Sequence, residues 1–414
     1  MTPRAQTGRR LRVLVVTQLF PNAADPTNAV FNRLQLAALA RLCDVDLRAV
    51  IPWFPGARAF RRWSIAGRCA TVPAEEVVDG LLVRHPRVLF VPRIGAAIAP
   101  ALYVASLWPR VRRLAGRVDV VLGCWASPDG VAAVSLARRL GAAAVVKVHG
   151  SDLNVHARAP AARRALSLAL QRADRVVAVS RPLAEKTAEL GVARDRIALV
   201  RNGVDRELFR PRERRATRDE LGLDPGGRWI VFVGLLDRAK GIAELITAFD
   251  RLAPAHPELR LAVIGEGREE LLVRAAAARH PGRLIATGPL PAHEVARWLG
   301  ACDVLALPSW AEGTPNVILE AFASGRRVVA TAVGGIPDLV TSPALGTLVP
   351  PRDVPALADA LARAAREDYD AAALTAAAPS GWDDSAALLL DVLFTAASSH
   401  PATRLGAFRG ACDT

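Results

Sequence analysis

The chain has 414 residues, which predicts two domains with a sizeable buried core and excludes a peptide or a single small module. Apolar residues make up 51 % of the sequence and charged residues 23 %, a balance typical of a globular rather than a disordered protein. The five cysteines are odd in number and far apart. A disulfide framework and a zinc knuckle are therefore excluded, and a reducing compartment is expected.

The net charge of +14 is distributed unevenly along the chain. Residues 1–205 carry 31 Lys and Arg against 14 Asp and Glu, a net +17, whereas residues 206–414 carry 23 against 26, a net −3. A strongly basic half favours partners that carry phosphate: nucleic acid, anionic lipid headgroups or phosphorylated substrates. Composition does not choose among these. An ordinary solvated surface is the alternative, since 51 of the 54 basic residues are arginine.

The first predicted element is a β-strand at the amino terminus, where basic residues precede the apolar run Leu11 to Val16. We favour a strand over a signal peptide, because the run is short and no small-residue cleavage site follows it. Asp44 and Asp46 form a D-x-D sequence, which within VDLRAVI indicates part of a second strand rather than a metal site. The longest apolar stretch, Ile94 to Trp108, contains Pro100 and is shorter than the roughly 18 residues that span a bilayer, so no transmembrane helix is predicted.

Further along the chain, short β-branched runs alternate with Ala/Leu/Arg stretches of helical period. The runs predict strands at 13–17, 118–123, 143–150, 175–180, 229–234, 260–265, 302–309 and 326–332. Apolar strands separated by helices indicate parallel sheets covered on both faces, so the predicted fold class is α/β with two doubly wound domains. In such sheets ligands bind beyond the carboxyl ends of the strands.

The domain boundaries are predicted from a change in composition. The segment 209–228 is rich in charge, proline and glycine and lacks apolar periodicity, which indicates a linker. The first domain is then 1–208 and the second 229–378, and we expect a C-terminal helix and tail at 379–414 to pack back on the first domain. A nicotinamide-binding Rossmann domain is excluded, because no glycine occurs between Gly8 and Gly56 to form the required turn after the first strand.

The segment 302–330 carries the clearest candidate site. A strand ends near Leu307, and after a loop Thr314 and Pro315 are expected as the N-cap and first residue of a helix that Gly325 closes. The first turn of such a helix points its free amides back toward the strand ends, where they can bind a diphosphate.

Two amides and two carboxylates define this predicted site. Asn316 and Val317 supply the amides of the first turn, and Glu312 and Glu320 lie on either side of it. Ionised carboxylates only accept hydrogen bonds, so they suit the paired hydroxyl donors of a sugar or ribose.

The sequence from Glu312 to Glu320, followed by AFASG, resembles the E-x7-E motif of retaining GT-B glycosyltransferases, the large family 4-like, group 1 family. That family includes bacterial polysaccharide and phosphatidylinositol mannosyl transferases. Five further segments match it in order: KVHGSD at 147–152, RNGVD at 201–205, VGLLDRAKGIAELITAF at 233–249, VIGEG at 263–267 and TAVGGIPDLV at 331–340. The resemblance covers roughly residues 11–360, is closest to transferases of polysaccharide and cell-wall precursors, and implies the GT-B fold, in which two Rossmann-like doubly wound domains face each other across a cleft.

By position, the resemblance implies three catalytic residues. Glu312 would contact the transferred sugar, His149 would face the same sugar from the first domain, and Lys240 would neutralise the diphosphate. The implied donor-binding residues are Glu320, which would hold the ribose hydroxyls, and Gly313, Thr314, Asn316, Val317, Gly234 and Arg238. The candidates for the acceptor side or the cleft are Asn28, Asp152, Trp125 and Asn202.

Three positions depart from the family pattern. Leu235 stands where an arginine commonly follows the strand glycine, and Arg238 is the candidate to compensate for it. Ala29 lies in a phosphate-facing loop that usually carries glycine, and Asp338 replaces a frequent glutamate.

The resemblance thus predicts a retaining hexosyltransferase that needs no metal and no cofactor and takes a UDP- or GDP-sugar as donor. Its acceptor would be a saccharide or a lipid-linked saccharide in envelope polysaccharide or glycolipid biosynthesis. Two alternatives stay open: another nucleotide-sugar enzyme of the same fold, such as an epimerase or phosphorylase, and a basic nucleic-acid-binding protein. We expect no nucleic-acid partner, because no recognised binding motif accompanies the charge.

The expected location is cytoplasmic, with peripheral attachment to the inner face of the plasma membrane. The segment WFPGARAFRRW at 53–63 combines aromatic and arginine residues. This composition fits an anionic membrane surface and an ordinary arginine-rich loop equally well.

Overall fold

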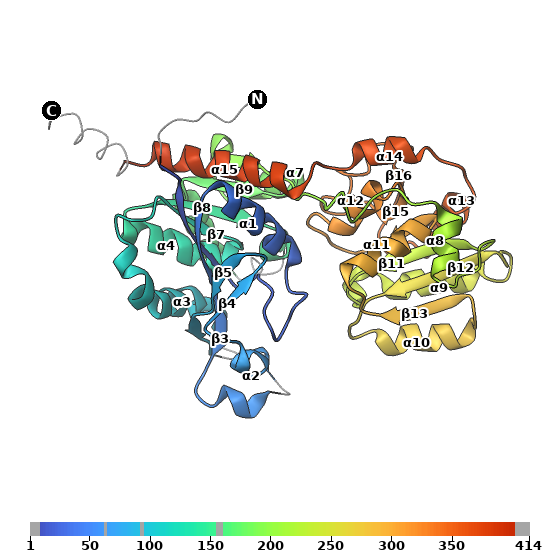
Figure 1. Ribbon diagram of the computed structural model, residues 1–414, viewed down its shortest axis with the longest axis horizontal. Coiled ribbons are helices and arrows are strands. Elements are labelled where there is room, and N and C mark those ends of the chain that lie inside the picture. Colours follow the sequence, from blue (N-terminus) through green and yellow to red (C-terminus); the bar gives the residue numbers. More distant parts are fainter. Residues whose placement is uncertain (1–8, 62–63, 92–94, 155–159, 402–414) are drawn as a thin grey trace. The chain divides into compact units, whose positions relative to one another are not determined.

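The computed structural model describes residues 9–61, 64–91, 95–154 and 160–401. The chain forms two compact units, of which unit 1 comprises residues 1–202 and 382–414 and unit 2 comprises residues 203–381 (Figure 1). Each unit is built on its own, mainly parallel sheet, so the α/β fold class predicted from the sequence is confirmed.

Unit 1 contains an eight-stranded sheet in the order β10-β9-β8-β7-β1-β2-β5-β4. All neighbouring strands are parallel except β4 and β5, which form an antiparallel pair at one edge. The strands are β1 (Arg12–Thr17), β2 (Asp44–Ala49), β4 (Glu75–Val78), β5 (Leu81–Arg84), β7 (Val120–Gly123), β8 (Ala143–Val148), β9 (Arg175–Ala178) and β10 (Ile197–Leu199). The amino-terminal apolar run is therefore strand β1, as predicted.

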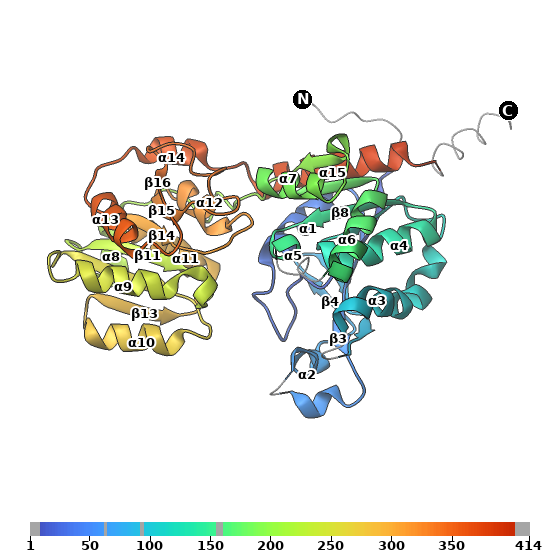
Figure 2. The same cartoon turned by 180° about the vertical axis from the view of Figure 1, so that it is seen from behind.

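Helices cover both faces of this sheet, because its strands are apolar on both sides. In β1, Val13 and Val15 pack with α1 and α15, whereas Leu14 and Val16 point to the opposite face and pack with α3, α4, α6 and α7. Figure 2 shows α3, α4 and α6 from behind. The helices of unit 1 are α1 (Val30–Leu42), α2 (Ile65–Arg68), α3 (Gly95–Val111), α4 (Val131–Leu140), α5 (Ser151–Asn154), α6 (Pro160–Arg172), α7 (Arg181–Glu189) and α15 (Trp382–Ser399).

A small second sheet is attached to unit 1. It consists of β3 (Ile51–Trp53) and β6 (Arg87–Leu89), which pair in parallel. β3 directly follows β2 and β6 directly follows β5, so this sheet extends from the carboxyl ends of two parallel strands. In Figure 1, β3 and α2 lie below the other elements of unit 1.

Unit 2 contains a six-stranded, fully parallel sheet in the order β13-β12-β11-β14-β15-β16. Its strands are β11 (Arg228–Val233), β12 (Leu259–Ile264), β13 (Leu284–Gly288), β14 (Val304–Leu307), β15 (Arg327–Thr331) and β16 (Gly346–Val349). The sheet grows in one direction from β11 to β13 and in the other from β14 to β16. The switch in direction lies between β11 and β14, and ligands of doubly wound sheets bind at such a point.

The helices of unit 2 are α8 (Arg214–Glu220), α9 (Ile242–Leu252), α10 (Glu270–Arg279), α11 (Ala292–Ala301), α12 (Asn316–Ala323), α13 (Val354–Ala364) and α14 (Ala371–Ala377). The linker predicted at 209–228 is wrong, because this segment contains α8 and lies within unit 2. Part of its charge is compensated within the unit: Arg218 and Arg214 donate to the two carboxylate oxygens of buried Asp303 over 2.7 and 2.9 Å. The charge that suggested an exposed linker therefore holds α8 in place.

The C-terminal segment returns to unit 1. Helix α15 packs against α1, and the Gln35 amide donates to Ser385 Oγ over 2.8 Å. Ser385 in turn donates to the Arg201 carbonyl over 2.7 Å. Residues 402–414 of the predicted tail lie outside the described residues. No helix of the described part of the chain is both long enough and apolar enough to cross a membrane.

Candidate functional site

The switch point of unit 2 brings two sequence-predicted residues together. Lys240 follows β11, Glu312 follows β14, and the Lys240 ammonium lies 2.7 Å from Glu312 Oε1. The same carboxylate oxygen accepts a hydrogen bond of 2.7 Å from Ser309 Oγ. The Glu312 side chain is only 8 % exposed, so its charge is held in place by two donors.

Close backbone contacts fix the loop that carries Lys240. A turn of helix over Arg238–Lys240 is capped by the Asp237 side chain, which accepts from the Ala239 amide over 2.9 Å. It ends at Gly241, whose φ of 71° lies in the left-handed region and whose added Cβ would meet the Pro308 carbonyl oxygen at 2.0 Å. Only glycine fits there, because the loops after β11 and β14 touch at this point.

The loop after β15 supports Glu312 from another side. Gly334 has a φ of 55°, and a Cβ at this position would lie 1.9 Å from the Glu312 carbonyl oxygen. The next residue, Gly335, donates its amide to the Gly313 carbonyl over 2.9 Å. The two glycines therefore bring the backbone of this loop directly against the segment that presents Glu312.

Helix α12 begins one residue later than the sequence indicated. Its first residue is Asn316 and Pro315 is the N-cap, whereas Thr314 and Pro315 had been expected as the N-cap and first residue. Proline fits the N-cap because this position needs no amide donor. Gly325, with a φ of 68°, follows the end of the helix as predicted. The first turn, including Val317, therefore stands at the carboxyl end of β14 and presents backbone amides there.

Glu320 is the second glutamate of the pair and lies inside α12. Burial raises the pKa of its carboxyl from 4.5 to about 7. No described residue donates a hydrogen bond to this carboxyl group. A desolvated carboxyl group without a hydrogen-bond partner lowers the stability of the fold. Glu320 is therefore a strong candidate for ligand binding.

Arg238 supplies a second cation beside Lys240. Its side chain is exposed, and it forms no ion pair with any residue that the structure describes. Leu235, at the position of the missing family arginine, is 56 % exposed and apolar. Arg238 is thus a cation of the β11 loop that is available to an anionic ligand.

In unit 1, His149 follows β8. Its ring packs against Phe31 with centroids 4.8 Å apart and bonds to the Cys124 backbone. Burial, and then the Lys147 charge, lower the pKa of His149 well below its usual value, so the ring is neutral at pH 7. Its Nε2 atom is buried and has no hydrogen-bond partner among the described residues.

The structure corrects the role predicted for Asp152. This side chain is fully buried, so it cannot contact an acceptor from the surface. Its carboxylate accepts hydrogen bonds from the amides of Ala126, His149, Gly150 and Leu153 over 2.7 to 3.2 Å. Asp152 therefore joins the loop after β7 to the loop after β8, and it positions His149.

The other three acceptor candidates also have structural contacts. Asn28 donates to the carbonyls of Gln18 and Phe20, both over 3.3 Å, and so closes the loop after β1. Trp125 is half-buried and packs against the core of unit 1. Asn202 is only 3 % exposed, which contradicts a role as an accessible acceptor contact. It is the last residue of unit 1 before the chain enters unit 2.

Three contacts of the site were not predicted from the sequence: those of Ser309, Trp310 and the Gly334–Gly335 pair. Trp310 donates its backbone amide to the Ala239 carbonyl over 2.8 Å and its ring nitrogen to Glu244 over 3.1 Å. The glycine pair falls within the matched segment 331–340, which was the only available signal for it. Ser309 and Trp310 carry no signal beyond their place after a strand.

The D-x-D sequence has a structural role. Asp46 accepts from Arg48 over 2.8 Å and from Arg84 over 3.2 Å, and Asp44 pairs with Arg10 over 3.0 Å. In the part of the chain that the structure describes, no group of three or more His, Cys, Asp or Glu side chains could hold a metal ion.

The chain has two doubly wound units, and unit 2 carries an acidic pair and a lysine at its switch point. This combination defines the class of GT-B glycosyltransferases. Residues 65–208 match the family model Glycosyltransferase Family 4, and residues 227–367 match the model Glycosyl transferases group 1. The chain is 32 % identical over 355 residues to D-inositol 3-phosphate glycosyltransferase 1 of Catenulispora acidiphila, covering 77 % of this chain and 82 % of that protein. The chain therefore belongs to this glycosyltransferase family.

Two further similarities are informative. The chain is 28 % identical over 367 residues to TuaC of Bacillus subtilis (strain 168), which is named a teichuronic acid biosynthesis glycosyltransferase, and the match covers 85 % of this chain and 89 % of TuaC. The crystal structure of Anabaena HepE in complex with UDP superposes with a TM-score of 0.63 at 18 % identity, covering 97 % of this chain and all of HepE. At that identity the likeness shows the GT-B fold alone.

Proposed function

We propose that this glycosyltransferase moves a hexosyl unit from a UDP- or GDP-sugar to a saccharide or lipid-linked saccharide, with retention of anomeric configuration. The observation that carries the proposal is Glu320. It is a half-buried carboxyl group to which no described residue donates, about one and a half helical turns from the start of α12, in the unit that holds the Lys240–Glu312 pair. Ribose hydroxyls would supply the donors that Glu320 lacks.

The donor diphosphate would bind at the first turn of α12. There the amides of α12 and the positive end of its dipole face an anion, and Lys240 and Arg238 add two full positive charges. Asn316, Thr314 and Gly313 provide the backbone of this loop, and Gly234 lets the nucleotide approach the end of β11. These groups would stabilise the charge that develops on the departing diphosphate.

The ion pair between Lys240 and Glu312 is the state of the site without a bound donor. A bound diphosphate would compete with Glu312 for Lys240, which frees the Glu312 carboxylate to accept hydrogen bonds from the sugar hydroxyls. In the reaction, the bond between the anomeric carbon and the leaving phosphate oxygen breaks, and a bond from the acceptor oxygen forms on the same face. The acceptor proton passes to the leaving phosphate, so the step needs neither a bound metal nor a cofactor.

His149 is the proposed contribution of unit 1. Its neutral ring bonds to the Cys124 backbone and leaves Nε2 as a buried acceptor without a donor. A hydroxyl of the transferred sugar would satisfy this atom. Because Nε2 is covered in the absence of substrate, we expect the Phe31 side chain to shift when the sugar binds.

The acceptor belongs, in this proposal, to envelope polysaccharide or glycolipid biosynthesis. TuaC supports this class of acceptor, because its name assigns it to the biosynthesis of teichuronic acid. We place the reaction at the inner face of the plasma membrane, where lipid-linked acceptors are available. Nucleic acid has no part in it.

A screen of nucleotide sugars tests the proposal. Purified protein is incubated with UDP- and GDP-sugars, and both the thermal shift and the slow release of free nucleoside diphosphate are measured. We expect one donor to raise the melting temperature and to release its diphosphate faster when a saccharide acceptor is added. Conversion of the donor into another nucleotide sugar would instead identify an epimerase, and dependence on inorganic phosphate would identify a phosphorylase.

A further inference from the structure

The arginines of unit 1 are not spread evenly. Residues 50–73 and 86–114 contain nine arginines and neither Asp nor Glu. The described residues of these two stretches form one body, because β3 pairs with β6, α2 packs on β3, and α3 packs on β6. We call residues 50–73 and 86–114 the basic lobe.

The carboxylates of the described residues do not pair with the exposed arginines of the basic lobe. Six of its arginines are exposed, and none of the six forms an ion pair with a described residue. They are Arg58, Arg61, Arg68, Arg110, Arg112 and Arg113. Some exposed arginines elsewhere do pair, as Arg194 does with Glu185 over 2.7 Å, whereas others, such as Arg163 and Arg164, form no ion pair with a described residue either. What sets the lobe apart is that its two stretches contain no acidic residue at all, so its charge favours an anionic partner from outside the chain.

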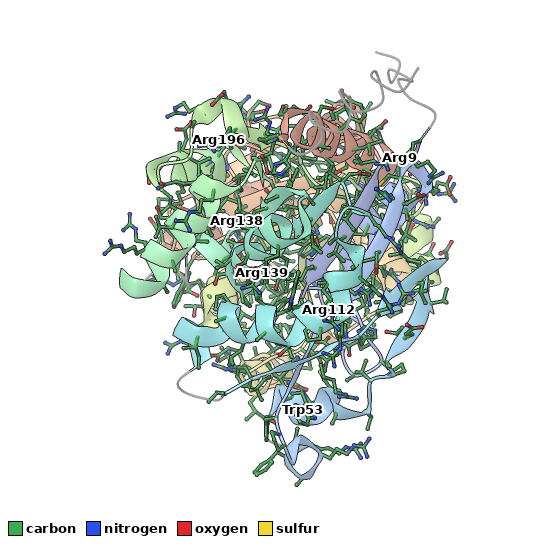
Figure 3. The ribbon with its side chains drawn as sticks, turned by 90° about the vertical axis from the view of Figure 1, so that its left-hand side faces the viewer. Arg9, Trp53, Arg112, Arg138, Arg139 and Arg196 are labelled. Atoms are coloured by element: carbon green, nitrogen blue, oxygen red, sulfur yellow. The ribbon has the colours of Figure 1, made fainter. Side chains whose placement is uncertain are left out.

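Large apolar side chains are exposed on the same lobe. Of the aromatic residues that the structure shows as strongly exposed, all but Phe394 lie here. The exposed apolar residues of the lobe are Trp53 (37 %), Phe60 (50 %), Ile65 (62 %), Leu89 (38 %), Phe90 (42 %) and Ile98 (41 %). Figure 3 shows Trp53 at the lower end of unit 1 and Arg112 above it on the same side. A surface that mixes arginine with aromatic and aliphatic side chains is typical of binding at a lipid interface.

A pocket rich in arginine lies at the base of the lobe. It has a volume of about 300 Å³, and its lining includes Arg48, Arg84, Arg87 and Arg110, with Glu75 as its single acid. The Arg48 side chain is only 8 % exposed, and its Nε is buried without a hydrogen-bond partner. Arg87 and Arg110 bond to carbonyl groups and to no carboxylate. Arg48 and Arg84 are ion-paired with Asp46, and Arg84 also with Glu75, so Arg87 and Arg110 are the guanidinium groups left to bind the oxygens of a phosphate group.

We propose that the basic lobe docks unit 1 on a bilayer of anionic phospholipid. The exposed arginines contact lipid phosphates, the apolar side chains enter the boundary between headgroups and acyl chains, and the arginine pocket takes one headgroup. The lobe extends from the carboxyl ends of β2 and β5, the end of the sheet that also presents His149. If the proposed transfer to a lipid-linked acceptor holds, docking brings this end of unit 1 to the membrane that contains the acceptor.

Vesicle sedimentation with the full chain tests the docking. The vesicles consist of phosphatidylcholine with or without phosphatidylglycerol, and we expect binding only with phosphatidylglycerol and a loss of binding at high salt. Arg112→Glu together with Arg113→Glu should weaken binding at least about tenfold, because each arginine near such a surface strengthens binding by about fivefold. Arg163→Glu with Arg164→Glu is the matched control, since this exposed adjacent pair lies on α6, outside the lobe.

A second variant tests the apolar part. Phe60→Ser with Ile65→Ser keeps all charges and removes two exposed side chains, so it should weaken vesicle binding without changing the far-ultraviolet spectrum. Lys240→Ala should bind vesicles like the wild type, which separates docking from donor binding. Equal binding to vesicles without phosphatidylglycerol, or equal losses in the α6 control, would overturn the proposal. The proposal would also be overturned if the protein bound duplex DNA through Arg112 and Arg113 but did not bind vesicles.

Discussion

Lys240 and Glu312 form an ion pair of 2.7 Å although they are 72 residues apart, and Ser309 bonds to the same carboxylate oxygen. The pair joins the loops after β11 and β14, the two strands at which the sheet of unit 2 changes direction. Each partner is therefore occupied before any ligand arrives. A donor must exchange these contacts for its own, and this exchange leads to the first prediction.

Replacing Glu312 by glutamine should separate binding from turnover. The neutral amide cannot hold Lys240 by charge, and it no longer repels a diphosphate, so UDP or GDP should bind about three- to tenfold more tightly. Transfer should nevertheless fall, because the sugar hydroxyls lose a charged acceptor. Calorimetry and initial rates measure the two effects. Weaker binding of the free nucleotide by Glu312→Gln would show that Glu312 assists the diphosphate rather than competing with it.

Glu320 should make unit 2 less stable as the pH rises. The folded protein holds a proton on Glu320 up to about pH 7, whereas the unfolded chain releases it near 4.5. Stability is thus highest below pH 4.5 and is lost as the pH increases through 7, where the charged group costs about 1 to 3 kcal/mol. Glu320→Gln should be more stable than the wild type by this amount at about pH 8, with a difference below about 0.5 kcal/mol at about pH 4.5. Denaturant unfolding at both pH values measures this difference in the free energy of unfolding. A Glu320→Gln variant that is less stable than the wild type at the higher pH would contradict the presence of an unpaired, desolvated carboxyl group.

Alanine substitutions at two glycines, Gly334 and Gly282, distinguish a steric clash from backbone strain. Gly334 and Gly282 both have left-handed φ values, 55° and 70°, but only Gly334 has an atom within 4 Å of its added Cβ, the Glu312 carbonyl oxygen at 1.9 Å. Alanine should therefore cost about 1 kcal/mol of strain at either site. Gly334→Ala should also displace Glu312 and slow transfer at least about tenfold, whereas Gly282→Ala should keep full activity. Equal activities of the two variants would indicate that the loop after β15 does not position Glu312.

Asp152→Asn should act on folding. The carboxylate accepts from four backbone amides, and asparagine would turn an amide group toward some of these donors. We expect unit 1 to lose about 2 to 4 kcal/mol of stability. Nucleotide binding by unit 2 should be unchanged, which serves as the internal control. A stable variant with only a raised KM for the acceptor would restore the contact role that was predicted from the sequence.

The strands were the most predictable part of the fold. The eight strands predicted from apolar runs and the strand predicted at Asp44 and Asp46 all overlap observed ones, because parallel strands buried on both faces are continuous apolar runs such as RWIVFV in β11. The β3 and β6 strands are only three residues long, and β4 alternates between exposed and half-buried positions, so no comparable signal marked them. The segment 209–228 was misread because Asp303, which forms ion pairs with Arg214 and Arg218, is distant in sequence.

The site was predictable where a residue belongs to a contiguous motif. Glu312, Glu320 and Lys240 were found in this way, and the structure places Lys240 against Glu312. The sequence did not reveal that Asp152 faces inward, since a short helix after a strand can present either side. Nor did it reveal the close approach of Gly334, because this depends on a loop that returns from β15.

Nucleotide binding by two single variants tests the central claim most directly. UDP and GDP are titrated into the wild type, Lys240→Ala and Glu320→Ala, with Lys186→Ala of unit 1 as a control for the loss of one lysine. We expect the wild type and the control to bind one of the nucleotides with the same affinity and both site variants to lose detectable binding. Wild-type affinity in both Lys240→Ala and Glu320→Ala would contradict a donor site at the start of α12.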